Sequence, residues 1–216
     1  MMSKVGPADT AIDVGAYKGG YTYWMRRAVG ARGLVLAFEP QPEAAYYLRC
    51  AQEAFDWLNV LVVESALSSE PGRRVLLRPG STSPAASLEG VSLPPEPKGL
   101  DVTVDTIDRR LRRHAAGRPL RFIKCDVEGH ELEVFRGAEN ALREHRPAIL
   151  VECEVRHLSG HTVRDVFDHL QRLGYRGCFF LGGRAQDLSR IDPSTHQVEG
   201  RRPYVNNFAF EWCAAA

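Results

Sequence analysis

The chain has 216 residues and a mass of 24.1 kDa, the size of one domain with a sizeable buried core. Apolar residues make up 44% and charged residues 25%, which excludes disordered, collagen-like and coiled-coil chains. Because 28 Lys and Arg nearly balance 27 Asp and Glu, no field of the whole molecule attracts nucleic acid or an anionic membrane.

The chain carries no apolar run of about 18 residues and no signal-peptide pattern at its start, so we expect a cytoplasmic protein without a membrane span. Its five cysteines lie far apart and form no CxxC pair. This spacing argues against a disulfide framework and against a thiolate zinc site.

The first part of the chain alternates short apolar runs with helical patterns. Strands are predicted at 10–14, 34–38 and 60–63, and helices over about 21–29 and 42–55. Residues 64–118 then interrupt the alternation, with short strands predicted at 74–78 and 102–105. Between these two, residues 79–99 are rich in Pro, Ser and Gly, which predicts either a mobile loop near the ligand or a plain surface connection.

The alternation resumes in the second part. Strands are predicted at 122–125 and 148–151, helices at 131–143 and 163–173, and a terminal hairpin at 175–181 and 208–212 around the polar connection 182–204. Strands joined by helices demand right-handed crossovers, so the sequence predicts a doubly wound, mainly parallel α/β sheet in one domain, 1–216. We expect the loops 79–99 and 182–204 to shape a substrate pocket.

In such a sheet ligands bind outside the carboxyl ends of the strands. The first strand contains Asp13, and Gly15 and Gly19 follow it, where they allow the backbone to turn sharply and approach a ligand. The GxGxxG pattern of a dinucleotide site is absent. An acid before an uncharged turn suits a cationic ligand such as S-adenosylmethionine, although an ordinary tight turn is the alternative.

Glu39 ends the second strand, 26 residues after Asp13. A carboxylate at this position can accept hydrogen bonds from both hydroxyls of a ribose. Alternatively, it only complements the dipole of the helix that starts beyond Pro40.

A second acidic group follows the strand at 122–125. We expect Asp126, but not Glu131, to face the ligand cleft, and Glu128 or Glu131 to cap the next helix. His130 is either a catalytic base or a surface or capping histidine. Glu152 ends the following strand, so it meets Asp126 if the two strands are neighbours. The two carboxylates would then hold Mg²⁺ or another hard divalent ion, or they are two acids kept apart by hydrogen bonds.

Six segments over about 9–154 together resemble the FkbM-type family of class I S-adenosylmethionine-dependent methyltransferases. They are DVGAYKGGYT, AFEP, ESALSS, VTVDTID, FIKCDVEGHELEVFRGAENAL and RPAILVECE, with a weaker echo in NFAF at 207–210. The resemblance implies a seven-stranded sheet with an antiparallel last strand. It also implies methyl transfer to a hydroxyl of a small molecule, sugar or natural product.

The resemblance assigns cofactor-binding positions residue by residue. They are Asp13, Gly15, Tyr17 and Gly19 in the cofactor loop, Glu39 with Pro40 at the ribose, Ser65 and Ala66 beside the adenine, and Asp126 after the fourth strand. At Tyr17 the family usually has Asn, so a polar contact near the methionine part of the cofactor is altered.

An alcohol is a weak nucleophile, so its proton must pass to a base or its pKa must be lowered by a metal. His130 is our candidate base, and Asp126 with Glu152 is the candidate metal or base pair. The partner is expected to be a small-molecule acceptor, which the sequence does not identify. The terminal hairpin is a plausible edge for a homodimer.

Two other functions compete with this interpretation. The arginines at 109–113, with Arg118 and Arg121, could bind the phosphates of an RNA substrate, but such a run is more often the solvated face of a helix, here with Ile107 and Leu111 inward. A cofactor-binding accessory domain without catalysis is the second alternative. A nicotinamide oxidoreductase is disfavoured by the glycine spacing.

Overall fold

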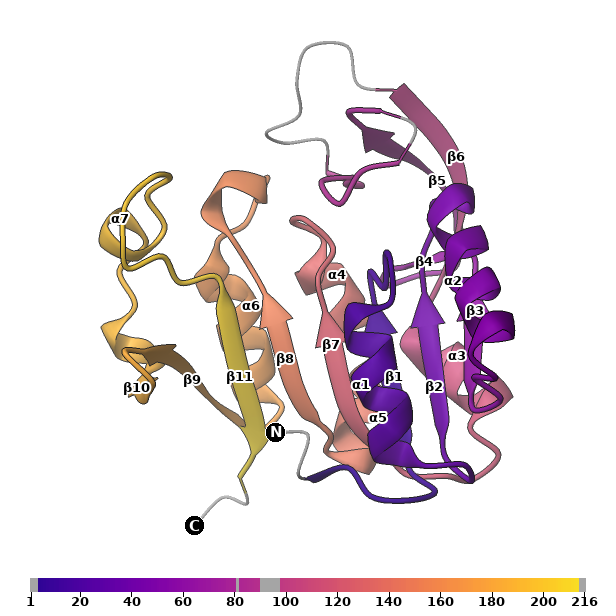
Figure 1. Ribbon diagram of the computed structural model, residues 1–216. Coiled ribbons are helices and arrows are strands. Elements are labelled where there is room, and N and C mark those ends of the chain that lie inside the picture. Colours follow the sequence, from indigo (N-terminus) through magenta and orange to yellow (C-terminus); the bar gives the residue numbers. More distant parts are fainter. Residues whose placement is uncertain (1–3, 81, 90–97, 214–216) are drawn as a thin grey trace.

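The computed structural model describes residues 4–80, 82–89 and 98–213 and is built around one large mixed sheet (Figure 1). The strand order is β10 (Arg184–Asp187), β9 (Tyr175–Leu181), β11 (Asn207–Trp212), β8 (Ala148–Glu152), β7 (Leu120–Cys125), β1 (Thr10–Val14), β2 (Leu34–Phe38) and β3 (Val60–Val63). Neighbours from β8 to β3 are parallel, and β11 is antiparallel to both β8 and β9.

The mostly parallel sheet with an antiparallel last strand is therefore confirmed, but it has eight strands where the family resemblance implied seven. The additional strand is β10, which pairs antiparallel with β9. It is formed by residues that we expected to be polar connection, because a turn at Gly182 and Gly183, both with positive φ, folds the chain back onto β9.

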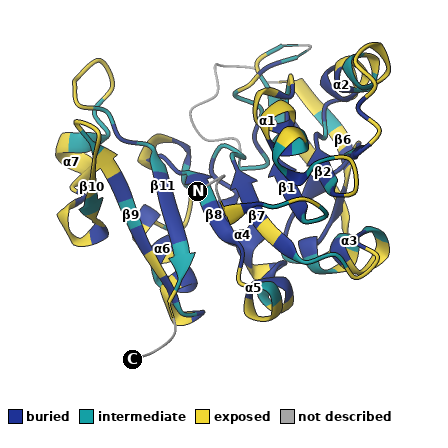
Figure 2. Ribbon diagram, turned by 60° about the horizontal axis from the view of Figure 1, so that its bottom comes forward, coloured by how far each residue is buried: buried dark blue, intermediate teal, exposed yellow. Residues whose placement is uncertain are grey.

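Helices cover the two faces of the sheet (Figures 1 and 2). One face carries α1 (Gly20–Val29) and α2 (Pro42–Ala54), and the other carries α3 (Ile107–His114), α4 (Glu131–Arg136), α5 (Glu139–His145) and α6 (Val163–Arg172). Short helices follow at η2 (Val155–His157), η3 (Leu188–Arg190) and α7 (Pro193–His196). Along β1 the side chains alternate between the two cores, since Ala11 packs with the α1 side and Ile12 and Val14 pack with the opposite side. Within the described residues, no helix combines the length and the apolar character needed to cross a membrane.

A second sheet of three strands stands beyond the carboxyl ends of the main sheet (Figure 1). It contains β4 (Ala66–Leu67), β6 (Lys98–Asp105) and β5 (Gly72–Arg78) in that order. The predicted strands at 74–78 and 102–105 lie in β5 and β6. Residues 82–89 return along β5, where Ser87 pairs with Leu77, and we call this segment the strap. Residues 81 and 90–97 of the predicted loop lie outside the described residues.

The helix predicted at 131–143 is instead two helices, α4 and α5, separated at Gly137. A Cβ atom at Gly137 would lie 2.0 Å from the backbone oxygen of Ser68, which follows β4. The backbone oxygen of Gly137 also accepts a hydrogen bond from the backbone N–H of Asp108. The chain therefore breaks its helix where it packs against two distant segments, information that the helical period does not contain.

Candidate active site

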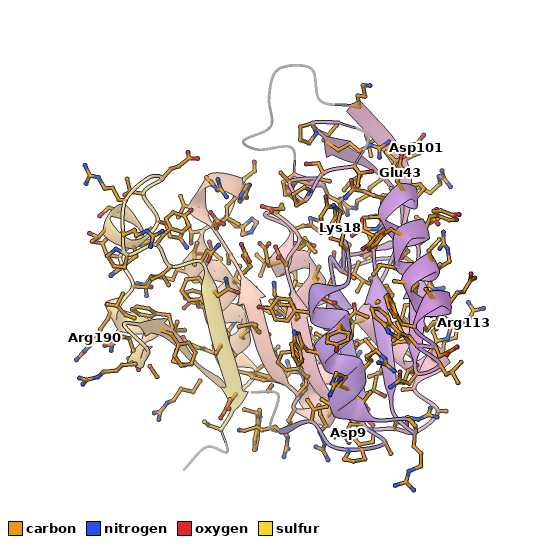
Figure 3. All side chains as sticks on the ribbon, in the orientation of Figure 1. Asp9, Lys18, Glu43, Asp101, Arg113 and Arg190 are labelled. Carbon is orange, nitrogen blue, oxygen red and sulfur yellow. The ribbon has the colours of Figure 1, made fainter. Side chains whose placement is uncertain are left out.

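A cavity of about 260 Å³ opens at the carboxyl ends of the central strands, below the second sheet. In Figure 3 Lys18 marks this edge of the sheet and Asp9 marks the opposite one. The cavity is lined by Val14, Gly15, Tyr17, Phe38, Glu39, Pro40, Gln41, Ser65, Ala66, Leu67, Leu76, Pro84, Ala86, Leu88, Asp126, Val127, Glu128, His130 and Glu152. Most of the candidate site residues thus share one cavity, and of the candidates only Asp13 and Gly19 are not part of its lining.

The glycine loop after β1 requires glycine at two positions. Gly15 has a φ of 77°, and a Cβ atom there would lie 1.9 Å from the backbone oxygen of Asp126. Gly19 has a φ of 81° and precedes α1, where a Cβ atom would lie 2.6 Å from a side-chain carbon of Leu48. These glycines let the loop pass close to β7 and turn sharply into α1.

Glu39 is a buried carboxylate held by backbone donors on both oxygens. The N–H of Tyr17 donates to Oε2 at 2.8 Å, and the N–H of Gln41 donates to Oε1 at 2.9 Å. Burial raises the pKa of Glu39, and these hydrogen bonds oppose that rise. A carboxylate oxygen can accept more than one hydrogen bond, so Glu39 retains acceptor capacity toward the cavity. The tyrosine at position 17 has a φ of 45°, a region that Asn tolerates better than Tyr.

Asp13 is buried beside the cavity. Its carboxylate accepts a hydrogen bond of 2.5 Å from the hydroxyl of Thr22 on α1, and burial raises its pKa to about 6. In this arrangement Asp13 ties β1 to α1. Its direct contact with a ligand stays a prediction.

The strap lies against the cavity and is tied to α2. The side chain of Gln41 donates to the backbone oxygen of Ser83 and accepts from its N–H, both at 2.9 Å. Pro84, Ala86 and Leu88 of the strap line the cavity. The described part of the segment 79–99 thus lies near the site. Among the described residues none of 182–204 lines the cavity, and the role of that segment in shaping a pocket stays a prediction.

Strands β7 and β8 are neighbours, which brings Asp126 and Glu152 to one end of the cavity. Between them lies a residue that the sequence analysis missed. The Nζ atom of Lys124 is 3.1 Å from Oδ2 of Asp126 and 4.0 Å from Oε2 of Glu152, and the side chain is only 1% exposed. A lysine inside the apolar strand that precedes Asp126 was the available signal, because buried lysines are rare unless they are paired.

Glu152 is the cavity carboxylate with the most strongly altered acidity. Burial and the nearby Asp126 raise its pKa to about 7, although Lys124 acts in the opposite direction. The amide of Asn206 donates to Oε1 of Glu152 at 2.6 Å and also to Glu154 at 2.9 Å. Glu152 therefore changes its charge near neutral pH.

His130 is buried with both ring nitrogens engaged. Its Nδ1 atom lies 2.5 Å from Oε1 of Glu89 in the strap, and its Nε2 atom lies 2.9 Å from the hydroxyl of Ser68. To accept a proton from a substrate, His130 would have to exchange one of these contacts. Its role as a base stays a prediction.

Two other acids of this segment have partners within the protein. Glu128 lies 2.8 Å from Nε2 of His157. Glu131 accepts a hydrogen bond of 3.0 Å from the N–H of Gly129, and burial raises its pKa to about 7. Glu131 is not part of the cavity lining, and its donor Gly129 precedes His130, the N-cap residue of α4, so this hydrogen bond does not cap the helix.

The acidic pair does not have the surroundings of a divalent cation site. No group of three His, Cys, Asp or Glu side chains in the described part of the chain is placed to hold a metal ion. The Lys124 ammonium already supplies a positive charge between Asp126 and Glu152. Of the two alternatives for this pair, the geometry fits acids with a partner inside the protein.

The arginine run that suggested RNA binding lies largely on α3. Arg109 and Arg110 both pair with Asp105, at 3.3 and 2.8 Å, and Ile107 and Leu111 are buried. The predicted solvated helix with an apolar inner face is thus formed.

Three solved structures are similar to this chain over most of its length. The methyltransferase FkbM from Methylobacillus flagellatus KT has 16% identity and a TM-score of 0.60, and the match covers 94% of this chain and 43% of that one. A putative rRNA-methylase from Clostridium thermocellum has 10% identity and a TM-score of 0.54, with coverages of 100% and 92%. A SAM-dependent O-methyltransferase from Thermotoga maritima has 16% identity and a TM-score of 0.49, with coverages of 100% and 64%.

At these identities the first two structures show a common fold, and the chain spans less than half the length of the Methylobacillus protein. No curated protein matches the sequence. The family model of the methyltransferase FkbM domain, however, matches residues 13–176, which is well over half of the chain. The chain therefore belongs to the FkbM methyltransferase family.

Proposed function

We propose that this chain transfers the methyl group of S-adenosylmethionine to a hydroxyl group of a small molecule, sugar or natural product. The observation that carries the proposal is one cavity whose lining runs across four adjacent strand ends, from Glu39 after β2 to Glu152 at the end of β8. Such a cavity can hold the ribose beside Glu39 and the transferred methyl group at the end that contains Asp126 and Glu152, which we call the reacting end.

In this proposal, different residues of the cavity bind different parts of the cofactor. Glu39, Ser65 and Ala66 line the cavity. Glu39 would accept hydrogen bonds from the ribose hydroxyls, and Ser65 and Ala66 would form the wall beside the adenine. The glycine loop would let the backbone approach the methionine part of the cofactor, and Asp126, which lines the cavity, would lie toward the sulfonium. When bound, the cofactor supplies an electrophilic methyl group, and the electron pair of the broken carbon–sulfur bond remains on sulfur.

The acceptor must lose its hydroxyl proton as the new carbon–oxygen bond forms. Glu152 is the proposed proton acceptor, because its carboxylate lines the cavity and its pKa of about 7 suits a base at neutral pH. Asp126 lines the same end of the cavity. Alignment of the acceptor oxygen with the methyl group is the largest contribution that such a site makes.

Two measurements test the proposal. Titration calorimetry of the wild-type protein should detect binding of S-adenosylmethionine and of S-adenosylhomocysteine. Labelled methyl groups should then appear on hydroxyl acceptors in a panel of sugars and small alcohols. Glu152→Gln should lower this rate at least tenfold with little effect on the affinity for S-adenosylhomocysteine, whose sulfur is uncharged. Absence of heat for both nucleosides would refute the proposal, and binding without transfer to any acceptor would favour an accessory domain.

A further inference from the structure

Lys124 lies beside the reacting end of the cavity, and neither the assigned cofactor positions nor the proposed mechanism uses it. Its side chain projects from β7 toward the face covered by α1, where its Nζ atom lies 5.1 Å from the ring centre of Tyr21. Asp13 is its partner in register on the adjacent strand β1. An ammonium buried to this extent costs free energy unless nearby negative charge compensates it.

The compensating charge comes from the cavity. The Nζ atom lies 3.1 Å from Asp126 and 4.0 Å from Glu152, and both of these carboxylates line the cavity. Lys124 itself does not line the cavity, so the two carboxylates lie between its ammonium and the cavity. Two carboxylates at one end of a cavity repel each other, and a cation between them is the usual way to hold them together.

We propose that Lys124 is a positioning residue, whose ammonium holds the Asp126 and Glu152 carboxylates at the reacting end in the place that a divalent cation would otherwise take. This inference rests on the proposed function, because it places the sulfonium of the cofactor at the same end. A lysine suits the task since its ammonium is a compact point charge with three donors. Methyl transfer in this protein then requires no divalent metal.

The affinities for S-adenosylmethionine and S-adenosylhomocysteine provide a test that needs no acceptor. The two molecules differ by one methyl group and by the positive charge on sulfur, so the ratio of their Kd values reports the charge at the reacting end. At pH 8.5, Lys124→Met should favour the charged sulfonium and shift this ratio about fivefold toward S-adenosylmethionine, because a positive charge has been removed nearby. A merely structural lysine would weaken both affinities in parallel, and an unchanged ratio in folded Lys124→Met would overturn the proposal.

Two further variants make the result specific. Removal of one partner of a buried pair is more destabilising than removal of both, so the double variant Lys124→Met with Glu152→Gln keeps the test available if the single variant does not fold. Its ratio should return to within about twofold of the wild type, and a ratio far from the wild-type value would overturn the proposal. Lys4→Met is the matched control, since Lys4 is exposed and pairs with Glu211, and it should leave the ratio unchanged.

Mn²⁺ binding, measured by electron paramagnetic resonance, tests whether the site holds a divalent metal, and this test needs no cofactor. The wild-type protein should leave Mn²⁺ free at submillimolar concentrations. One bound Mn²⁺ per chain that is lost in Asp126→Asn would overturn the proposal. If neither nucleoside binds to the wild type, the proposed function fails. The Mn²⁺ measurement still tests whether the Lys124 ammonium takes the place of a divalent cation.

Discussion

At the scale of single residues, the carboxylates near the cavity differ in what compensates their burial. Glu39 is held by two backbone N–H groups, Asp13 by the hydroxyl of Thr22, and Glu152 by the side chains of Lys124 and Asn206. Backbone donors fix the position of a carboxylate most rigidly, because the loop itself would have to move to release it. Glu39 is therefore the acid whose place in the cavity is most firmly set.

We expect Glu39→Gln to raise the Kd for S-adenosylhomocysteine about tenfold or more. The substitution removes a charged acceptor from the proposed ribose site and places an amide NH₂ beside the N–H groups of Tyr17 and Gln41. Titration calorimetry measures the change. The control is Glu43→Gln, since Glu43 is exposed in the first turn of α2 and pairs with Arg78, and equal loss in both variants would contradict a ribose-binding role for Glu39.

At the scale of elements, the strap connects parts of the site that are distant in the sequence. Gln41 ties it to α2, the hydroxyl of Ser87 donates to the backbone oxygen of Glu128 at 2.5 Å, and Glu89 contacts His130. The break between α4 and α5 at Gly137 belongs to the same arrangement, since it packs against Ser68, whose hydroxyl contacts His130. The loops around the cavity thus stabilise one another.

Gly137→Ala should lower Tm by several degrees, because its Cβ would lie 2.0 Å from the backbone oxygen of Ser68 and the two segments would have to separate. Thermal unfolding followed by circular dichroism measures the effect. Gly72→Ala is the matched control, since a Cβ at that position of β5 meets no atom within 4 Å. A Tm equal to that of the control would show that the close approach at Gly137 does not contribute to stability.

At the scale of the whole molecule, three carboxyl groups with raised pKa values, those of Asp13, Glu131 and Glu152, lie in or next to the central strands β1, β7 and β8. Burial raises the pKa of Asp13 to about 6 and those of Glu131 and Glu152 to about 7, all above their ordinary values. In each case the folded protein binds the proton more tightly than the unfolded chain does. These groups make the stability of the molecule depend on pH in one direction.

We therefore expect Tm to fall as pH rises from 5 to 8. For Glu131 the stabilising contribution is fully present below its ordinary pKa of 4.5 and is lost as pH rises through about 7, because the ionised carboxylate is then buried. Glu131→Gln should flatten this dependence, and Glu70→Gln, at an exposed position, should leave it as in the wild type. A wild-type Tm that is constant or rises over this range would contradict the predicted ionisation of these buried acids.

The sequence by itself determined the order and type of most elements, and the observed bounds of β1, β2, β3 and β9 coincide with the predicted ones. These elements are encoded locally, by the period of their apolar residues and by glycine or proline at their ends. The sequence also predicted that Gly15 and Glu39 lie at one ligand site, because the carboxyl ends of neighbouring parallel strands share one edge of the sheet.

Only the tertiary structure decided which groups stand between the predicted acids. Lys124 lies between Asp126 and Glu152, and the break at Gly137 and the contact of Glu89 with His130 arise from segments far apart along the chain. The local sequence does not predict which of these residues come into contact, because the contacts depend on how the chain packs on itself. The charge balance of this site is therefore a property of the folded molecule.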